Sequence, residues 1–260
     1  MDYTIVIPVY NMENQLQHAI TSAINQTHPP ADILIYDDAS SDNSMTVINR
    51  YANDKRIQVV RMKQNSGISV VLNAALAKVR TSYMIQLDGD DWLEPNAAIS
   101  LIEALEHRPG AAFSYGNHRL WSINEHKQSV LWDQVIQPSF NSKYDFLLNL
   151  GYMLNPRCYR VSCVRKVGGW ITDDPDDPWK GRYYEDARMI LRLVGKFEWV
   201  HVPKFLHNVR YDLNKSASKI KIYNHLRKMF YEKMLISWGN EYRPVWEMNA
   251  AGRIVLKKLV

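Results

Sequence analysis

Short apolar segments alternate with amphipathic segments along the first half of the chain. Four of the apolar segments are rich in β-branched or aromatic residues and are flanked by turn residues, which predicts buried strands. These strands span residues 4–9, 32–36, 57–62 and 83–87. Between them, apolar residues recur at helical spacing within residues 14–26, 44–51 and 69–79. Strands that alternate with helices predict right-handed crossovers and a mostly parallel sheet covered by helices on both faces.

The second half of the chain is less regular. Residues 111–115 and 197–202 are typical of strands, residues 144–150 and 185–194 are typical of helices, and residues 171–181 form a polar, acidic loop. A long basic amphipathic segment follows at 219–238, and its apolar stripe consists of Ile222, Leu226, Met229, Phe230 and Met234. Because no internal repeat or linker interrupts the chain, we expect one compact α/β domain with a helical C-terminal appendage.

Composition narrows the class of protein. The chain has 260 residues, of which 46% are hydrophobic and 23% are charged, and this argues for a substantial core and against disorder. No apolar run approaches the ~20 residues that cross a bilayer. Met1 leads directly into a strand-like segment, without the basic region and cleavage site of a signal peptide. The only two cysteines, Cys158 and Cys163, are expected to be reduced thiols in a cytoplasmic chain.

The net charge of +5 is a mild positive excess. It suits an anionic small molecule, a lipid headgroup surface or a nucleic acid. Nucleic acid is the least expected of the three partners, because the positive charge is not gathered into an aromatic-interleaved strip in the first half.

Three aspartates directly follow the fourth predicted strand: Asp88, Asp90 and Asp91, with Gly89 between the first two. Carboxylates this close repel one another unless a cation or a hydrogen-bond donor neutralises them. Residues two apart in extended backbone point to the same side, so Asp88 and Asp90 can converge, while Gly89 allows another group to approach. Such oxygen ligands suit Mg²⁺ or Mn²⁺ that bridges to phosphate. The alternative is a solvated acidic turn before the next helix.

A second acidic pair, Asp37 and Asp38, ends the second predicted strand. A carboxylate there can accept hydrogen bonds from the N–H or hydroxyl groups of a ligand. Ser41 or Asp42 is expected to cap the next helix, but capping does not explain two consecutive aspartates at the strand end. Tyr10, after the first strand, either stacks on a base or is ordinary half-buried packing.

The motifs of several enzyme classes are absent from this sequence. No Gly-x-Gly-x-x-Gly follows the first strand, which argues against a dinucleotide enzyme, and no Gly-x-x-x-x-Gly-Lys-Ser/Thr loop of a P-loop protein is present. Trp92 stands where a phosphatase of the Asp-x-Asp-x-Thr/Val kind has Thr or Val, and there is no Gly-x-Ser-x-Gly elbow.

The order and spacing of the remaining motifs resemble the family 2 glycosyltransferases of the GT-A fold. The matching residues, in chain order, are Ile7-Pro8-Val9-Tyr10-Asn11, Ser22, Gln26-Thr27, Asp37-Asp38-Ala39-Ser40-Ser41-Asp42, Asn65-Ser66-Gly67, Asn73, Leu87-Asp88-Gly89-Asp90-Asp91, Pro95, Gly168-Gly169-Trp170, Glu185-Asp186 and Arg192-Leu193. Each motif is weak alone, but their order and spacing together are specific.

The resemblance implies a GT-A-like, Rossmann-like central sheet and the transfer of a sugar, with inversion, from a nucleotide donor that is usually UDP-linked. Residues 1–110 would be the nucleotide-sugar-binding half of a single GT-A domain. Residues 111–215 would be its acceptor-binding half, and residues 216–260 the helical appendage.

The resemblance also implies roles for particular residues. Asp38 would bind the uracil, Asp90 together with Asp88 would ligate Mn²⁺ or Mg²⁺, and Asp186 would be the general base. The residues implied to bind the nucleotide-sugar are Pro8, Tyr10, Asp38, Asn65, Gly67, Asn73, Asp88 and Gly89. Inverting transfer needs one carboxylate to deprotonate the acceptor hydroxyl and a cation to offset charge on the departing diphosphate. For Glu185 and Asp186 the alternative is that acids in a first helical turn favour the helix dipole.

The chain also departs from the family pattern. Leu72 precedes Asn73 where many relatives carry Arg, and Val209-Arg210-Tyr211-Asp212 stands where many have Tyr-Arg-x-His. A surface role is therefore expected for Arg210 and for His207. There is no Gln-x-x-Arg-Trp and no membrane span, which argues against a processive synthase and for addition of a single sugar.

Acceptor contacts are expected from the less regular half of the chain. Trp179 can stack on a sugar face, and Trp170 and Glu185 are further candidates; a solvated acidic loop is the alternative at Trp179. The segment 219–238 is expected to pack on the domain or on a sister subunit. Its basic flank favours a second hypothesis, peripheral attachment to anionic lipid at the cytoplasmic membrane face.

The sequence thus predicts a metal-dependent, inverting, non-processive glycosyltransferase with a glycan, glycolipid or protein acceptor, acting in surface glycan or glycoconjugate assembly. An oligomer is compatible with this prediction. Two alternatives stay open. A non-catalytic nucleotide-sugar or glycan-binding module would need Asp186 only as a helix-cap acid. A sugar-phosphate nucleotidyltransferase would carry a Gly-rich, Arg/Lys-bearing loop where this chain has Asn11-Met12-Glu13-Asn14.

Overall fold

The computed structural model describes residues 1–123, 128–150, 154–210 and 219–260. Its strands are β1 (Tyr3–Val9), β2 (Asp32–Asp37), β3 (Ile57–Arg61), β4 (Tyr83–Gln86), β5 (Trp92–Leu93), β6 (Ala111–Ile123), β7 (Ser129–Val135), β8 (Arg157–Arg160), β9 (Glu198–Arg210), β10 (Pro244–Met248) and β11 (Ile254–Leu259). Its helices are α1 (Leu16–Ile24), α2 (Ser44–Asn49), α3 (Ile68–Lys78), α4 (Ala97–Glu106), α5 (Lys143–Asn149), α6 (Val161–Lys166), α7 (Glu185–Val194) and α9 (Ile220–Ser237).

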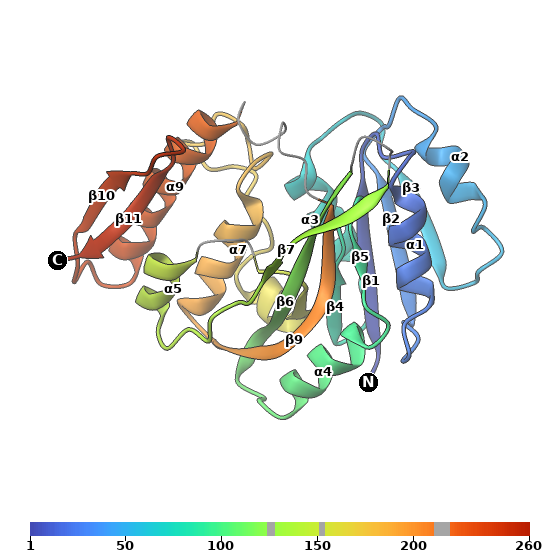
Figure 1. Ribbon diagram of the computed structural model, residues 1–260, viewed down its shortest axis with the longest axis horizontal. Helices are drawn as coiled ribbons and strands as arrows, with labels where there is room; N and C mark the ends of the chain where they lie inside the picture. Colours follow the sequence, from blue (N-terminus) through green and yellow to red (C-terminus); the bar gives the residue numbers. More distant parts are fainter. Residues whose placement is uncertain (124–127, 151–153, 211–218) are drawn as a thin grey trace.

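The first half of the large sheet is parallel, as the alternation of strands and helices predicted. All four predicted strands are present, and β3, β2, β1 and β4 are parallel neighbours in that order. Their carboxyl ends therefore lie at one edge of the sheet (Figure 1). This edge is where ligands of open α/β sheets bind.

The second half of the sheet mixes directions. Beyond β4 the order continues β8-β6-β9-β5, with β7 paired to β6. β8 is antiparallel to β4 and β6, whereas β9 is parallel to β6. β5 follows β4 closely in sequence yet pairs with β9 at the far end of the strand order, where Trp92 is opposite Asn208. The sheet therefore curls back on itself.

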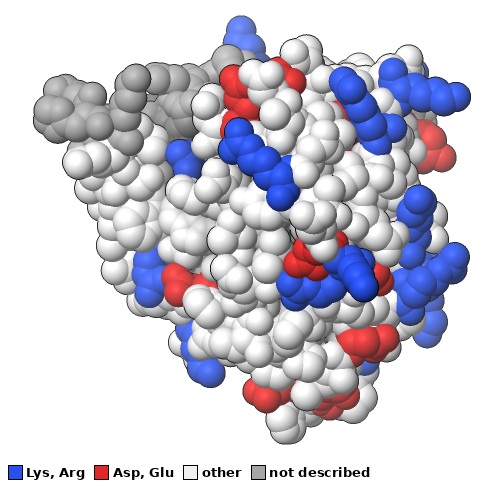
Figure 2. All heavy atoms as spheres, turned by 90° about the vertical axis from the view of Figure 1, so that its right-hand side faces the viewer, with Lys and Arg blue, Asp and Glu red and all other residues white. Residues whose placement is uncertain are grey.

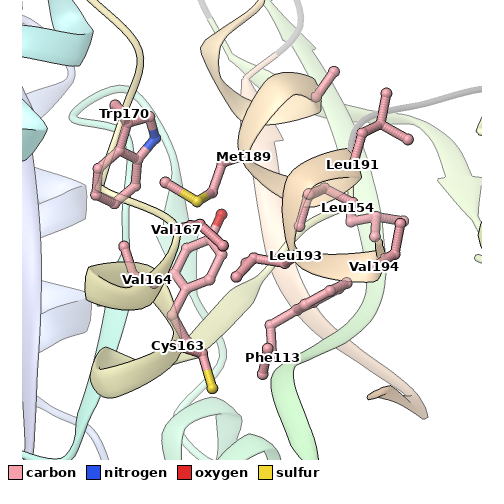
Figure 3. Packing of buried hydrophobic residues seen from close by; sticks show 14 of the residues in the cluster. Phe113, Leu154, Cys163, Val164, Val167, Trp170, Met189, Leu191, Leu193 and Val194 are labelled. Atoms are coloured by element: carbon pink, nitrogen blue, oxygen red, sulfur yellow. The ribbon is translucent and has the colours of Figure 1, made fainter. Parts of the chain in front are cut away.

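Helices cover both faces of the sheet, and the alternation of side chains along the strands explains why. In β1, Ile5 and Ile7 belong to a cluster shared with α1, α2 and α4, whereas Val6 belongs to a cluster on the opposite face. The second cluster includes residues of α3, α6 and α7, and Figure 3 shows Trp170, Met189 and Phe113 packed within it. A strand buried on both faces has no polar face, which accounts for its continuous apolar sequence.

The C-terminal appendage is a helix followed by a β-hairpin. The buried residues of α9 are Leu226, Phe230, Tyr231, Met234 and Leu235, which largely confirms the predicted apolar stripe. This stripe packs against α7 and its surroundings, so packing on the domain, the default expectation, is what the structure shows. The antiparallel pair β10–β11 was not predicted. The appendage is therefore not helical throughout, and the expected boundary at residues 215/216 lies outside the described residues.

Three expectations from composition can be compared with the structure. Among the described helices, none has the length and apolar character needed to cross a membrane. Cys158 and Cys163 are both buried free thiols, as expected. On the face in Figure 2, basic side chains are scattered and several lie beside acidic ones, rather than forming one continuous strip.

Candidate active site

Polar side chains from distant parts of the chain meet next to the parallel edge of the sheet. Gln86, the last residue of β4, lies with its amide nitrogen 3.4 Å from Oδ1 of Asp88 and 3.2 Å from Oδ1 of Asp186. One side chain therefore connects the carboxylate predicted to bind the metal and the nucleotide-sugar with the carboxylate predicted to be the base. The two carboxylates belong to different halves of the domain.

Arg157, at the start of β8, is the cationic partner of Asp186. Its Nη2 lies 3.0 Å from Oδ2 of Asp186, and its Nη1 donates to the Leu154 carbonyl oxygen at 2.9 Å. The Arg157 side chain is 1% exposed, and such a cation is stable only when it is paired. Sequence reasoning missed both Arg157 and Gln86. The available signal for Gln86 was a polar residue inside an otherwise apolar strand.

The acids in this region perturb one another. Burial raises the pKa of Asp186, the Arg157 charge opposes that shift, and the Asp88 charge adds to it. Burial and the neighbouring Asp186 charge raise the pKa of Glu185 well above its usual range. Perturbed carboxyl groups gathered at one place are typical of catalytic sites.

The third aspartate of the acidic cluster, Asp91, makes buried contacts within the protein. Asp91 is buried, and its Oδ2 lies 2.9 Å from Nε2 of His207, while its Oδ1 accepts the backbone N–H of Arg210 at 3.0 Å. Burial raises the pKa of Asp91 well above its usual range and lowers the pKa of His207 to about 3. The expected surface role of His207 is wrong, because the pairing of β5 with β9 encloses this residue.

Arg210 is half-buried rather than fully at the surface, and its Nε is a buried atom that has no hydrogen-bond partner among the described residues. Tyr211 and Asp212, the next two residues of the divergent motif, lie outside the described residues.

The aspartates that end β2 organise the loop before α3. Oδ1 and Oδ2 of Asp38 accept the backbone N–H groups of Ser66 and Gly67 at 2.7 and 2.8 Å. Asp37 is fully buried and pairs with Arg61 at 3.2 Å. Gly67 has φ +90°, a conformation that favours glycine, and an added Cβ would lie 2.7 Å from Arg182 Cγ. The predicted contact of Asp38 with a base stays a prediction.

Other residues of the predicted donor site lie around this edge. Pro8 is buried in β1 opposite Tyr36, and Tyr10 is 46% exposed just after it. A Cβ at Gly89 would lie 3.2 Å from the Pro8 carbonyl oxygen, so the close backbone approach expected at Gly89 is present. Asn65 accepts hydrogen bonds from Arg182 through its side chain and its backbone.

Two residues predicted to bind ligands make contacts inside the fold. Asn73 donates to the Trp170 carbonyl oxygen at 2.7 Å and accepts the Trp170 N–H at 2.8 Å, which ties α3 to the segment before α7. Trp170 itself is 2% exposed and lies in the core (Figure 3). The prediction that Trp170 stacks on an acceptor sugar is wrong, because a ring enclosed by the core offers no open face. The donor contact predicted for Asn73 stays untested.

Trp179 and Glu185 are both half-buried and remain accessible. Trp179 makes edge-to-face contacts with Tyr183 and His225. Glu185 begins α7, directly after Tyr184, which has φ 63°.

The predicted metal ligands fit a site completed by substrate. Among the described residues, no group of three or more His, Cys, Asp or Glu side chains is arranged to hold a metal ion. Asp88 and Asp90 are half-buried carboxylates, and Mg²⁺-type ions commonly take one or two carboxylates together with substrate phosphates and water. The Asp88 charge contributes to the raised pKa values of the nearby acids Asp91, Glu185 and Asp186. A divalent cation bound at Asp88 would offset that repulsion between the carboxylates.

The sequence matches the family described as Glycosyl transferase family 2 over residues 4–165, more than half of the chain. The chain therefore belongs to glycosyltransferase family 2. A hyaluronan synthase of Pasteurella multocida is 42% identical over 222 residues, which cover 84% of this chain and 21% of the relative. A chondroitin synthase of Pasteurella multocida strain Pm70 is 42% identical over 207 residues, which cover 79% of this chain and 20% of that relative. The chain thus spans about a fifth of the length of these two relatives.

Solved structures share the architecture. A crystal structure of residues 1–349 of S. aureus TarS matches with TM-score 0.69 at 14% identity and covers 90% of this chain and 66% of that chain. Mannosyltransferase PcManGT from Pyrobaculum calidifontis, in complex with GDP-Man and Mn²⁺, matches with TM-score 0.64 at 12% identity. The match covers 92% of this chain and 70% of that chain. At these identities the likeness shows the fold alone, and that fold is the expected GT-A fold.

Proposed function

We propose that this chain transfers a single sugar from a nucleotide donor to a hydroxyl group of a glycan acceptor in polysaccharide biosynthesis. The observation that carries the proposal is the Gln86 bridge, which brings Asp88 and Asp186 together at the ligand-binding edge of a GT-A sheet. Membership of family 2 and the similarity to two polysaccharide synthases support it.

Asp186 acts as the general base in this proposal. Its carboxylate accepts the proton of the acceptor hydroxyl as that oxygen attacks the anomeric carbon, and the bond to the diphosphate breaks on the opposite face. Arg157 holds the carboxylate in place and favours its ionised form, since its charge opposes the effect of burial on the pKa of Asp186. Inversion at the anomeric carbon follows from this single displacement.

Asp90 and Asp88 would hold Mn²⁺ or Mg²⁺ at the donor diphosphate. When bound, the ion supplies positive charge that offsets the charge on the departing nucleotide. The donor base would sit near Tyr10, Pro8 and Asp38, at the ends of β1 and β2. UDP is the proposed nucleotide, in line with a TarS structure solved with UDP-GlcNAc, whereas the PcManGT structure contains GDP-Man.

A panel of nucleotide-sugars tests the proposal, with released nucleotide measured in the presence and absence of Mn²⁺. The wild-type chain should release nucleotide from one donor in a metal-dependent manner, while Asp90→Ala should lose both turnover and metal-dependent UDP binding without unfolding. Asp186→Asn should bind donor but fail to transfer. Wild-type turnover by Asp90→Ala would refute the metal assignment.

A non-catalytic nucleotide-sugar-binding module has one observation in its favour: Asp186 already has a buried ionic partner in Arg157. Such a module would bind UDP in the presence of Mn²⁺ but release no nucleotide from any donor. Metal-dependent release that is absent in Asp186→Asn would refute this alternative.

Peripheral membrane contact through α9 would rely on charge alone. The apolar stripe of α9 is buried against the domain, so the exposed Lys221 and Lys228 remain for anionic lipid. Sedimentation with neutral and with anionic vesicles tests this hypothesis, and equal recovery from both would remove it.

A further inference from the structure

We propose that Trp179, Tyr183, Tyr223 and His225, here called the aromatic platform, bind a pyranose ring of the acceptor glycan beside Asp186. The inference rests on the proposed glycosyl transfer and adds residues of α9 to the acceptor site. Neither the loop before α7 nor α9 falls within residues 4–165, where the family match lies. Trp179 is the acceptor candidate named from the sequence, and the structure adds Tyr183, Tyr223 and His225 to it.

The four rings are continuous across two elements. Trp179 meets His225 with ring centroids 5.7 Å apart and meets Tyr183 at 6.4 Å. Tyr183 in turn meets Tyr223 at 6.3 Å, with the two ring planes at 85°. Edge-to-face contacts of this kind fix ring orientation and link the loop before α7 to the first turns of α9.

The platform remains open to solvent, in contrast to the ring cluster around Phe113. Trp179, Tyr183 and Tyr223 are half-buried and His225 is exposed, whereas Phe113 and its neighbours are enclosed in the core. A group of aromatic rings left partly exposed on a monomer marks a surface that meets a partner. Rings with a hydroxyl or N–H at the rim suit a sugar, which presents apolar C–H faces and a polar edge.

The platform adjoins the proposed base. Tyr183 and Tyr184 immediately precede Glu185 and Asp186, and the Tyr184 ring lies 6.4 Å from the Tyr223 ring. Burial, followed by the charge of Glu185, raises the pKa of Tyr223 to about 12, and Asp186 adds to this shift. A sugar ring that stacks here therefore lies next to the carboxylate that must receive a proton from its hydroxyl.

A cation from the start of α9 packs against the platform. The Nζ of Lys219 lies 5.4 Å from the centroid of the Tyr183 ring. This contact holds the Tyr183 ring in position from the side of α9.

Acceptor kinetics test the inference, with tetrasaccharides prepared from hyaluronan and from chondroitin as probes. Trp179→Ala and Tyr223→Ala should each raise the acceptor KM about tenfold, the effect expected for loss of one stacked ring. The donor KM should stay at its wild-type value. Tyr223→Phe, which keeps the ring, should retain most of the acceptor affinity.

Tyr242→Ala is the matched control. Tyr242 is 38% exposed and makes an edge-to-face contact with Tyr144 of α5 rather than with a platform ring, so its removal should leave the acceptor KM unchanged. Thermal melting of each variant shows whether the fold is retained. Titration of the same tetrasaccharides into Asp186→Asn, with and without Trp179→Ala, measures acceptor binding without turnover.

Wild-type acceptor affinity in both platform variants would overturn the inference, as would an equal loss in Tyr242→Ala or the absence of tetrasaccharide binding to the wild-type chain. If no donor is turned over, but tetrasaccharide binds and Trp179→Ala weakens it, the platform stands and the proposed transfer fails.

Discussion

Replacing Arg157 by Met should destabilise the protein strongly, because it leaves Asp186 buried without its cation. The Arg157 side chain is 1% exposed and the Asp186 side chain 13% exposed, with 3.0 Å between Nη2 and Oδ2. Removing one partner of a buried ion pair costs about 3–5 kcal/mol. The matched control is Arg119→Met, whose 2.9 Å pair with Glu94 is about one-third exposed. That variant should lose at most about 1 kcal/mol.

The loss in Arg157→Met should depend on pH. Burial already raises the pKa of Asp186, and removing Arg157 raises it further, so the folded variant binds a proton more tightly than the unfolded chain. The stability deficit relative to wild type should therefore be largest at neutral pH and shrink as acid protonates Asp186 in both states. Turnover at neutral pH should fall for the same reason, since a protonated carboxyl cannot accept the acceptor proton.

Urea unfolding between pH 5 and pH 8, for wild type, Arg157→Met, Asp186→Asn and the double variant, measures these effects. The two single losses should not add, because the double variant buries no unpaired charge. The reasoning is refuted if Arg157→Met lowers the free energy of unfolding by less than about 1 kcal/mol. It is also refuted if the loss is the same at every pH and adds to the loss in Asp186→Asn.

Two further predictions concern buried side chains outside this ion pair. His118 is 2% exposed, and burial lowers its pKa to about 4. Because an unfolded histidine has a pKa of about 6.5, the free energy of unfolding should fall by up to about 3 kcal/mol as the pH drops from about 6.5 to 4. Urea unfolding at pH 7 and at pH 5 measures this fall. The prediction would be contradicted if His118→Gln left the pH dependence of the free energy of unfolding unchanged. Trp170→Ala should cost about 3–5 kcal/mol in urea unfolding, as expected for a ring in the core. A loss below about 0.5 kcal/mol would instead indicate a surface ring.

The first half of the fold could be predicted from the sequence because its signals are local. A strand buried on both faces must be apolar throughout, and the helices beside it must carry apolar residues at helical spacing. The segments at 4–9 and 83–87 are apolar except for Thr4 and Gln86, and β1 and β4 are indeed neighbours in the sheet.

The second half depended on pairings that no local pattern specifies. β5 is only the pair Trp92–Leu93, and it is a strand because β9 lies beside it. The hairpin β10–β11 was likewise missed, since its strands are short and mostly half-buried or exposed. Strands of this kind are defined by their partners rather than by their own composition.

The candidate site divides in the same way. The sequence by itself supplied the chemical groups, because a run of aspartates after an apolar strand and an acid pair at a helix start are visible in the residue types alone. Only the tertiary structure decided that Gln86 joins Asp88 to Asp186 across 100 residues of chain, that Arg157 is the cation beside them and that Trp170 lies in the core. Burial and charge pairing depend on which distant segments pack together, and that packing is a property of the whole domain.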